Sequence, residues 1–490
     1  MPRHFFALAL RFAVPFGVFA LLLPAASAQP DRTQRPAVGP PPVFTPPPVE
    51  RFTLSNGLPV LFMEKPGVPL AQVNLLVRAG SAADPTGKFG LASMMADMLD
   101  EGAGPRDALA LADALDFLGV SLSTGAGHHH YEVQLHAPLA RLDSALGIMA
   151  DVALRPTFPA NELDRLRAQL LTAFTQRRDQ PRALASLLFN RVLYGEAHPY
   201  GRPVAGDPAG VHALTRDDLA RFHSAYTHPD NAALVVVGAL SRADAQARLE
   251  RHFGAAPWPA ARTTAERPRV ADAPQVARRT VYLVDKPGAA QSVIYIGRIG
   301  VPRSTPEYAA LEVLNTVLGG SFTSRLNQNL RERNGYSYGA GSSFSYREGA
   351  GPFVARSDVQ TDATGPALRE FFHELAAIEQ PIPDEELAKA RSYAALSFPQ
   401  AFQTVAGAAG VLSELWLYDL PEEAYREHAA RLLAVTSADA SAAAGRTLDD
   451  ERVAVVVVGD RAQVEAAVRA LDLGPVEVLT IDDVAGPPDP

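Results

Sequence analysis

Residues 319–339 read GGSFTSRLNQNLRERNGYSYG, and they contain the start and end signals of a short helix followed by a strand. The glycine pair interrupts the preceding segment, and three hydroxyl residues can cap a new helix: Ser321, Thr323 and Ser324. Leu326 and Leu330 are four residues apart, so they share the face that packs inward. Gly335 ends the helix because glycine adopts the left-handed conformation at little cost.

The segment after Gly335 predicts a strand, since residues 336–346 are rich in aromatic residues, serine and glycine. Arg331 then lies in the last turn of the helix, and Tyr338 lies in the strand just after it. A guanidinium and a phenol at one helix–strand corner can hold a peptide carbonyl between them. Read without context, both are ordinary residues, a solvated charge at a helix end and a strand aromatic.

An internal repeat surrounds this segment. Lys65-Pro-Gly recurs as Lys286-Pro-Gly, and the valine run that ends at Gly238 recurs in the run that ends at Gly459, both 221 residues later. Two matches at one offset predict two copies of one unit of about 200 residues. Each copy mixes hairpin-type strands with long helical tracts. The expected fold class is therefore α+β, with two homologous domains, each a largely antiparallel β-sheet packed with α-helices.

The expected division of the chain follows from the repeat and from composition. It comprises a signal peptide (1–28), a Pro-rich linker (29–48), an N-terminal domain (49–258), a linker (259–278), a C-terminal domain (279–475) and a tail (476–490). Within the tail, residues 476–481 have the pattern of an edge strand. The long helical tracts are expected at 106–118, 139–153, 161–178, 182–193, 306–318, 363–378 and 384–397.

The first 28 residues resemble an export signal, with an apolar run at 5–23 and a small-residue site at 26–28. Arg11 interrupts the apolar run, so no stable membrane anchor is expected after signal removal. The 490 residues include no cysteine and carry a formal charge of −9, which argues against nucleic acid and anionic membranes as partners. Export without disulfides predicts a periplasmic location.

Local motifs in both copies resemble the pitrilysin/insulinase family of zinc metallopeptidases. In the first copy they are Asn56-Gly-Leu, Ala79-Gly-Ser, Gly87-Lys-Phe-Gly-Leu-Ala, His198-Pro-Tyr-Gly and Pro229-Asp-Asn. In the second copy residues 331–338 match the family's Arg-Glu-x-x-Gly-x-x-Tyr signature. The resemblance implies that Arg331 and Tyr338 reach into an active-site cleft and bind the substrate backbone. It also implies that they favour the oxyanion formed during hydrolysis.

The zinc motif implied by this resemblance is degenerate. The family has His-x-x-Glu-His on a first-domain helix, where two histidines bind zinc and the glutamate activates water. This chain has Ser93, Ala96 and Asp97 at those three key positions. The third ligand, a glutamate on the helix expected at 161–178, is missing too, because residues 165–178 include no acidic residue. No metal site and no cofactor are therefore expected in this chain.

A histidine-rich tract is the alternative place for a metal. If residues 128–136 form one strand, His128, His130, Glu132, Gln134 and His136 face one way. Three alternating polar residues can bind a metal, but the solvated face of a sheet is the more ordinary interpretation. His198 is expected to make a local hydrogen bond within its loop.

Three functions remain open at this point. The first is the non-zinc subunit of a divided peptidase, which pairs with a zinc-bearing homologue and supplies Arg331 and Tyr338 for endoproteolysis of unfolded peptides. The peptides would bind by strand addition to a sheet edge. The second is a proteolytically inactive scaffold or peptide-binding protein of the same fold. The third is an autonomous hydrolase whose metal is held by Asp97 together with the tract 128–136.

Overall fold

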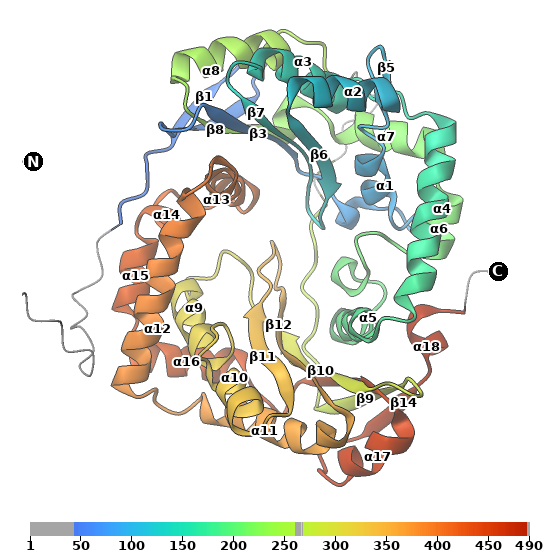
Figure 1. Ribbon diagram of the computed structural model, residues 1–490, viewed down its shortest axis with the longest axis vertical. Coiled ribbons are helices and arrows are strands. Elements are labelled where there is room, and N and C mark those ends of the chain that lie inside the picture. The colour runs from blue at the N-terminus through green and yellow to red at the C-terminus, as the bar shows by residue number, and fades with distance from the viewer. Residues whose placement is uncertain (1–43, 260–265, 267, 488–490) are drawn as a thin grey trace, which may run out of the picture. The chain divides into compact units, whose positions relative to one another are not determined.

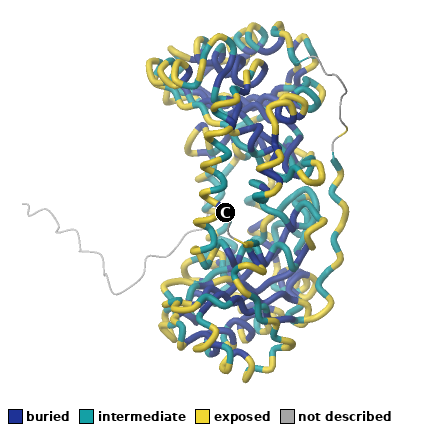
Figure 2. Tube along the Cα trace, turned by 90° about the vertical axis from the view of Figure 1, so that its right-hand side faces the viewer, coloured by how far each residue is buried: buried dark blue, intermediate teal, exposed yellow. Residues whose placement is uncertain are grey.

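Two valine-rich strands lie at the centre of two separate sheets. β8 (Ala232–Gly238) and β13 (Ala454–Gly459) are buried along their whole length, as continuous apolar strands must be. The computed structural model describes residues 44–259, 266 and 268–487. Figure 1 shows the sheets with their surrounding helices, and Figure 2 shows that buried residues lie inside and exposed residues on the outer surface.

The first sheet has six strands in the order β1-β2-β8-β3-β7-β6. The remaining bounds are β1 (Glu50–Thr53), β2 (Pro59–Glu64), β3 (Leu70–Val77), β6 (Ser121–Ala126) and β7 (Tyr131–Pro138). The second sheet has the order β14-β9-β13-β10-β12-β11. Its other strands are β9 (Thr280–Asp285), β10 (Gln291–Ile299), β11 (Ser337–Phe344), β12 (Pro352–Gln360) and β14 (Val476–Leu479).

The two sheets correspond strand by strand, which confirms the internal repeat. β9, β10 and β12 begin 221 residues after β2, β3 and β7. The pairs β2–β8, β9–β13 and β9–β14 are parallel, and the other pairs within these two sheets are antiparallel. The predicted α+β class with largely antiparallel sheets is therefore confirmed. β14 is an edge strand, as its sequence pattern predicts.

The helices of the first half include one in each of the four expected tracts. They are α1 (Leu91–Asp97), α2 (Ala108–Leu118), α3 (Leu142–Leu154), α4 (Ala160–Arg177), α5 (Pro181–Tyr194), α6 (Pro208–Ala213), α7 (Arg216–Tyr226) and α8 (Arg242–Leu249). α2 begins later than predicted because Arg106–Asp107 forms a short strand, β5, paired with β4 (Gly102–Ala103). Asp107 then caps α2 by accepting a hydrogen bond from the Ala110 amide at 2.9 Å.

The second half contains more helices than its sequence pattern predicts. They are α9 (Tyr308–Leu318), α10 (Arg325–Asn327), α11 (Thr364–Ala377), α12 (Asp384–Ser397), α13 (Val405–Leu417), α14 (Glu423–Arg426), α15 (His428–Ala434), α16 (Ser437–Thr447), α17 (Arg461–Arg469) and α18 (Ile481–Ala485). α9, α11 and α12 are among the expected tracts, and the bounds of α12 are as predicted. α13 to α16 and α18 are additional.

One face of each sheet is covered by a helix that belongs to the other half of the chain. Leu188 and Phe189 of α5 are buried in one apolar cluster with Val456 of β13, in the second sheet. Leu412 of α13 is buried in a cluster with Val235 of β8, in the first sheet. α5 and α13 occupy corresponding places in the repeat, so the exchange is reciprocal (Figure 1).

Some predicted segments fall outside the described residues. The predicted signal peptide (1–28), most of the Pro-rich linker (29–48) and residues 260–265 and 267 of the 259–278 linker are among them. Within the described residues, no helix combines the length and apolar character needed to cross a membrane.

His223 makes the stability of the first half depend on pH. Its Nε2 lies 2.8 Å from the Ala153 carbonyl oxygen, and burial lowers its pKa to about 4. Because an unfolded histidine titrates near 6.5, the unfolded chain takes up this proton first as the pH falls. His223 therefore contributes a loss of folding free energy that begins near pH 6.5 and is complete near pH 4.

We expect a His223→Gln variant to lack this dependence, since an amide does not titrate and can still donate to the Ala153 carbonyl. Between pH 7 and pH 4.5, wild-type protein should lose about 2–3 kcal/mol more than the variant. Urea unfolding at both pH values measures the difference. An equal loss in the two proteins would show that His223 does not hold the lowered pKa.

Candidate functional site

The helix–strand corner forms as its sequence predicts. α10 continues into a π-helical turn, η5 (Gln328–Arg333), and Gly335 ends it with a φ of 65°. Leu326 and Leu330 are fully buried on the inner face, which confirms the predicted pairing. Ser324 occupies the N-cap position, although its side chain makes no capping hydrogen bond. The wider π-helical turn places Arg331 at the end of the helix, next to the first residues of β11.

Arg331 and Tyr338 lie together, and a third residue joins them. The Arg331 guanidinium carbon is 5.0 Å from the centre of the Tyr338 ring and 4.7 Å from that of Phe322. Both distances are within cation–π range. Tyr338 is 88% exposed and Phe322 is 62% exposed, which is unusual for large aromatic side chains. Phe322 was not identified from the sequence, although it lies within the stretch quoted above.

These three residues line a cavity of about 690 Å³ against β11 and β12. The wall also contains Arg182, Arg356 and Asp358, so groups of both charges face the space. Arg182 comes from α5 in the first half, and its Nε donates to Asp358 Oδ2 at 2.7 Å. The reciprocal packing of α5 therefore brings a first-half cation to a second-half cavity.

Asn327 holds the corner in shape. Its Nδ2 donates to the Phe322 carbonyl at 2.6 Å, and its Oδ1 accepts from the Ala340 amide at 3.2 Å. The loop that presents Phe322 is thus tied to the strand that presents Tyr338. Such support reduces the ordering needed when a ligand binds.

The residues at the degenerate zinc motif include one carboxylate and no histidine. Ser93, Ala96 and Asp97 lie on α1, where Ala96 is fully buried and Asp97 reaches the surface. Desolvation by the surrounding atoms and then repulsion from Asp100 raise the pKa of Asp97, while a hydrogen bond from Ser93 lowers it. Among the residues that the structure describes, no three His, Asp or Glu side chains are arranged to hold a metal. One carboxylate beside a hydroxyl and a methyl group does not fit zinc, which needs three protein ligands.

An ion pair joins α4 to the segment that follows α1. α1 and α4 are the two helices that carry the zinc ligands in the family that the sequence resembles. Arg165 on α4 lies 2.5 Å from Glu101, which follows α1 closely in the chain. Glu162 on the same helix also pairs with Arg165, at 2.6 Å. Arg165 therefore links Glu101 beside α1 to Glu162 on α4 through two ion pairs.

The histidine-rich tract is not one strand, so the predicted facing of His128 and His130 is wrong. β7 begins only at Tyr131, and residues 127–130 form the turn that leads into it. From there the alternation is as predicted, with Tyr131, Val133 and Leu135 buried. The turn separates the first histidines from the strand face that carries Glu132 and His136.

His128 and His129 instead contact other loops. His128 Nδ1 lies 3.1 Å from Ser81 Oγ, and burial, with Arg347 next, lowers its pKa to about 3. His129 lies 2.6 Å from the Tyr200 hydroxyl and 2.8 Å from a Glu348 oxygen. These contacts join the first-half turn to the loop between β11 and β12. His198 accepts from the Tyr200 amide at 3.0 Å, which confirms its predicted local hydrogen bond.

The fold and the corner define a two-domain, peptidase-like protein. Residues 59–206 match the model of the insulinase family, peptidase family M16, and residues 213–393 match that of the M16 inactive domain. The chain belongs to the M16 peptidase family. The resemblance inferred from the sequence motifs is therefore confirmed.

Relatives and solved structures agree with this placement. An uncharacterized zinc protease of Mycobacterium leprae is 29% identical over 59% of this chain and 64% of its own length. One from Mycobacterium tuberculosis is 30% identical over 59% of this chain and 65% of its own. The chain thus spans less than two thirds of these relatives. A peptidase M16 inactive domain structure from Pseudomonas fluorescens aligns with a TM-score of 0.78 and 27% identity, covering 84% of this chain and 98% of that one.

Proposed function

We propose that this chain is the non-zinc subunit of a divided M16 peptidase. One observation carries the proposal: the chain presents the exposed rings of Tyr338 and Phe322 beside a half-buried Arg331, whereas α1 contains no histidine and no glutamate. Large aromatic side chains that are exposed together are typical of a surface that binds another molecule. A zinc-bearing homologue is proposed as the partner, and unfolded peptides are the proposed substrates.

The chemistry of the group suits this role. Arg331 and Tyr338 both donate hydrogen bonds, so together they can hold a peptide carbonyl oxygen. Their attraction grows as that oxygen becomes an oxyanion, which favours the transition state over the substrate. The zinc and the base that activates water belong to the partner in this proposal. This chain contributes binding and orientation.

Strand addition is proposed at the outer edge of β6. β11, an edge strand of the second sheet, already uses two of its amides, because Ala340 donates to Asn327 and Ser342 donates to the Gly319 carbonyl at 3.1 Å. β6 is the edge strand of the first sheet. An extended peptide binds such an edge through its backbone, so a broad range of sequences is expected. We further propose that the chain acts in the periplasm.

Zinc analysis and reconstitution test the proposal. The purified chain alone should contain substoichiometric zinc and should leave an unfolded peptide intact. Adding a homologue that carries His-x-x-Glu-His should produce cleavage at a rate above that of the homologue alone.

One zinc per chain together with cleavage by the chain alone would contradict the proposal. Peptide binding without any gain in cleavage on mixing would instead favour the alternative, a proteolytically inactive scaffold or peptide-binding protein. Analytical ultracentrifugation of the mixture separates these outcomes, because only the divided enzyme requires a stable complex.

A further inference from the structure

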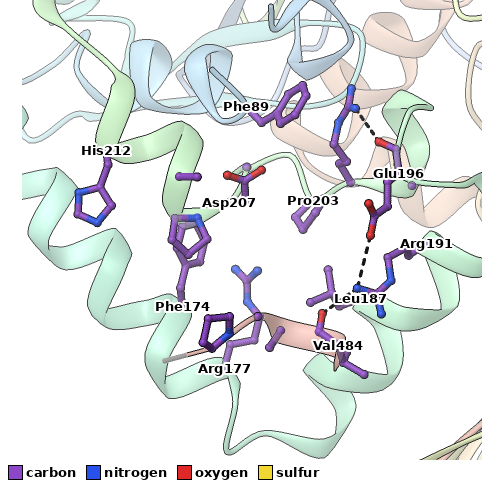
Figure 3. Close-up of a pocket in the computed structure, with 18 residues that line it drawn as sticks. Phe89, Phe174, Arg177, Leu187, Arg191, Glu196, Pro203, Asp207, His212 and Val484 are labelled. Atoms are coloured by element: carbon purple, nitrogen blue, oxygen red, sulfur yellow. Dashed lines mark hydrogen bonds and ion pairs between the residues drawn. The ribbon is translucent and has the colours of Figure 1, made fainter. Parts of the chain in front are cut away.

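A second cavity lies away from the Arg331 corner. It has a volume of about 630 Å³ and lies between α4, α5, α6 and the C-terminal helix α18 (Figure 3). Much of its wall is apolar, including Phe89, Phe174, Leu187, Pro203 and Val484. This volume is in the range of small-molecule sites, which combine apolar walls with a few polar groups.

The cavity is built between fixed elements. Arg191 on α5 donates to the carbonyls of Val484 at 3.2 Å and Asp483 at 2.8 Å, which holds α18 against α5. Arg202 donates to the Glu196 carbonyl at 2.7 Å, and its guanidinium lies 3.8 Å over the Phe89 ring. Contacts within the protein therefore hold the walls of the cavity in place before any ligand binds.

The charges in the wall do not balance. Three arginines and two carboxylates line the cavity: Arg177, Arg191, Arg202, Glu196 and Asp207. Glu196 lies 3.8 Å from Arg191. Asp207 caps α6 by accepting from the Gly210 amide at 2.7 Å, and Arg202 is attracted first by Asp84 and then by Asp207. Arg191 and Arg202 thus each have a carboxylate partner, whereas no ion pair of Arg177 is present within the described part of the chain.

Arg177 is a cation without a counter-ion among the described residues. Its guanidinium points into the cavity (Figure 3) and lies 4.8 Å over the Phe174 ring. Burial alone lowers its pKa, and no carboxylate of the described chain contributes to that shift. A partly buried charge is unfavourable unless an opposite charge reaches it. A guanidinium that has no carboxylate partner within residues 44–259, 266 and 268–487 and points into the cavity therefore suggests a negatively charged ligand.

We propose that this cavity binds a small amphipathic monocarboxylate, with the carboxylate on Arg177 and the apolar body against Phe89, Leu187 and Val484. The planar guanidinium matches a carboxylate through two parallel hydrogen bonds. One negative charge neutralises the single unmatched arginine. A phosphate dianion would bring excess charge against mainly apolar walls. The proposal does not depend on the proposed peptidase role.

Calorimetric titration of the full chain with octanoate tests this site, with octanol as the uncharged comparison. Octanoate should bind, and octanol should bind roughly ten- to hundredfold more weakly because it lacks the ion pair. Arg177→Gln should weaken octanoate by a similar factor and leave octanol unchanged. Arg177→Lys should fall between them, since it keeps the charge but loses the fork.

Arg165→Gln is the matched control, because Arg165 lies on the same helix but pairs with Glu101 and Glu162. It should bind octanoate like wild type. The melting temperature of ligand-free Arg177→Gln should not fall, which shows that the variant folds. Absence of octanoate binding up to about 5 mM, a weak-binding limit, would overturn the proposal. So would equal binding of octanol, or unchanged affinity in Arg177→Gln.

Discussion

Arg331→Ala is expected to lower kcat/KM of the reconstituted peptidase by roughly 10²–10³, the usual effect of removing an oxyanion donor. The loss should appear mainly in kcat, because the interaction strengthens as negative charge develops on the carbonyl oxygen. In the ligand-free chain Arg331 lies between Phe322 and Tyr338, so its removal leaves two exposed rings and no buried cavity. Folding should therefore be unaffected. Steady-state kinetics with a quenched fluorescent peptide measures the change.

Arg333→Ala is the matched control for this experiment. Arg333 is an exposed arginine of the same helical turn, and it is not among the residues that line the Arg331 cavity. Its removal should leave the rate within about twofold, as for other exposed surface substitutions. Tyr338→Phe should cause a smaller loss than Arg331→Ala because only a neutral donor is removed. Wild-type rates in both Arg331→Ala and Tyr338→Phe would refute the composite site.

Phe189→Ala is expected to reduce the free energy of unfolding by about 3–5 kcal/mol, as for other large-to-small core changes. Phe189 is buried on α5, and its ring centre lies 5.9 Å from that of Tyr295 in the second sheet. Gly297 on β10 leaves the space for it, since a Cβ there would lie 2.8 Å from Phe189 Cζ. The truncated side chain leaves a cavity between helix and sheet that neither element can close.

Phe117→Ala provides the control, because Phe117 on α2 is 83% exposed. Its effect on the unfolding free energy should be within about 0.5 kcal/mol. Urea unfolding followed by circular dichroism compares the two variants. Equal midpoints would mean that α5 contributes little to the second sheet, and the reciprocal exchange of helices would lose its energetic support.

Local patterns were sufficient to predict several parts of this protein. The corner at Arg331 forms as expected because its signals are short-range, with leucines four residues apart and a glycine in the left-handed region. The repeat predicted two matching sheets, since equal patterns of buried strands pair in equal ways. Donor chemistry at Ser93, Ala96 and Asp97 is a property of residue identity, so the lack of a zinc ligand set on this helix follows from the amino-acid sequence alone.

Local sequence patterns did not predict the structure of two segments, the histidine-rich turn and α13. Residues 128–130 are three histidines with no glycine, proline, asparagine or aspartate among them, so the sequence predicts that the following strand includes them. In the structure the chain turns there, toward Ser81 and Tyr200. α13 was not predicted because most of its residues are apolar, so the sequence shows no clear alternation of apolar and polar residues with a period of 3.6.

The sequence by itself determined the α+β repeat, the family, the Arg331–Tyr338 corner and the loss of zinc ligands. Only the tertiary structure decided that α5 and α13 cover each other's sheets, that Phe322 completes the corner, and that Arg177 faces a cavity without a counter-ion among the described residues. The physical reason is the sequence distance over which the interactions act. Helix ends, strand alternation and ligand chemistry depend on residues a few positions apart, whereas burial of an apolar face and pairing of a charge depend on residues brought together from distant parts of the chain.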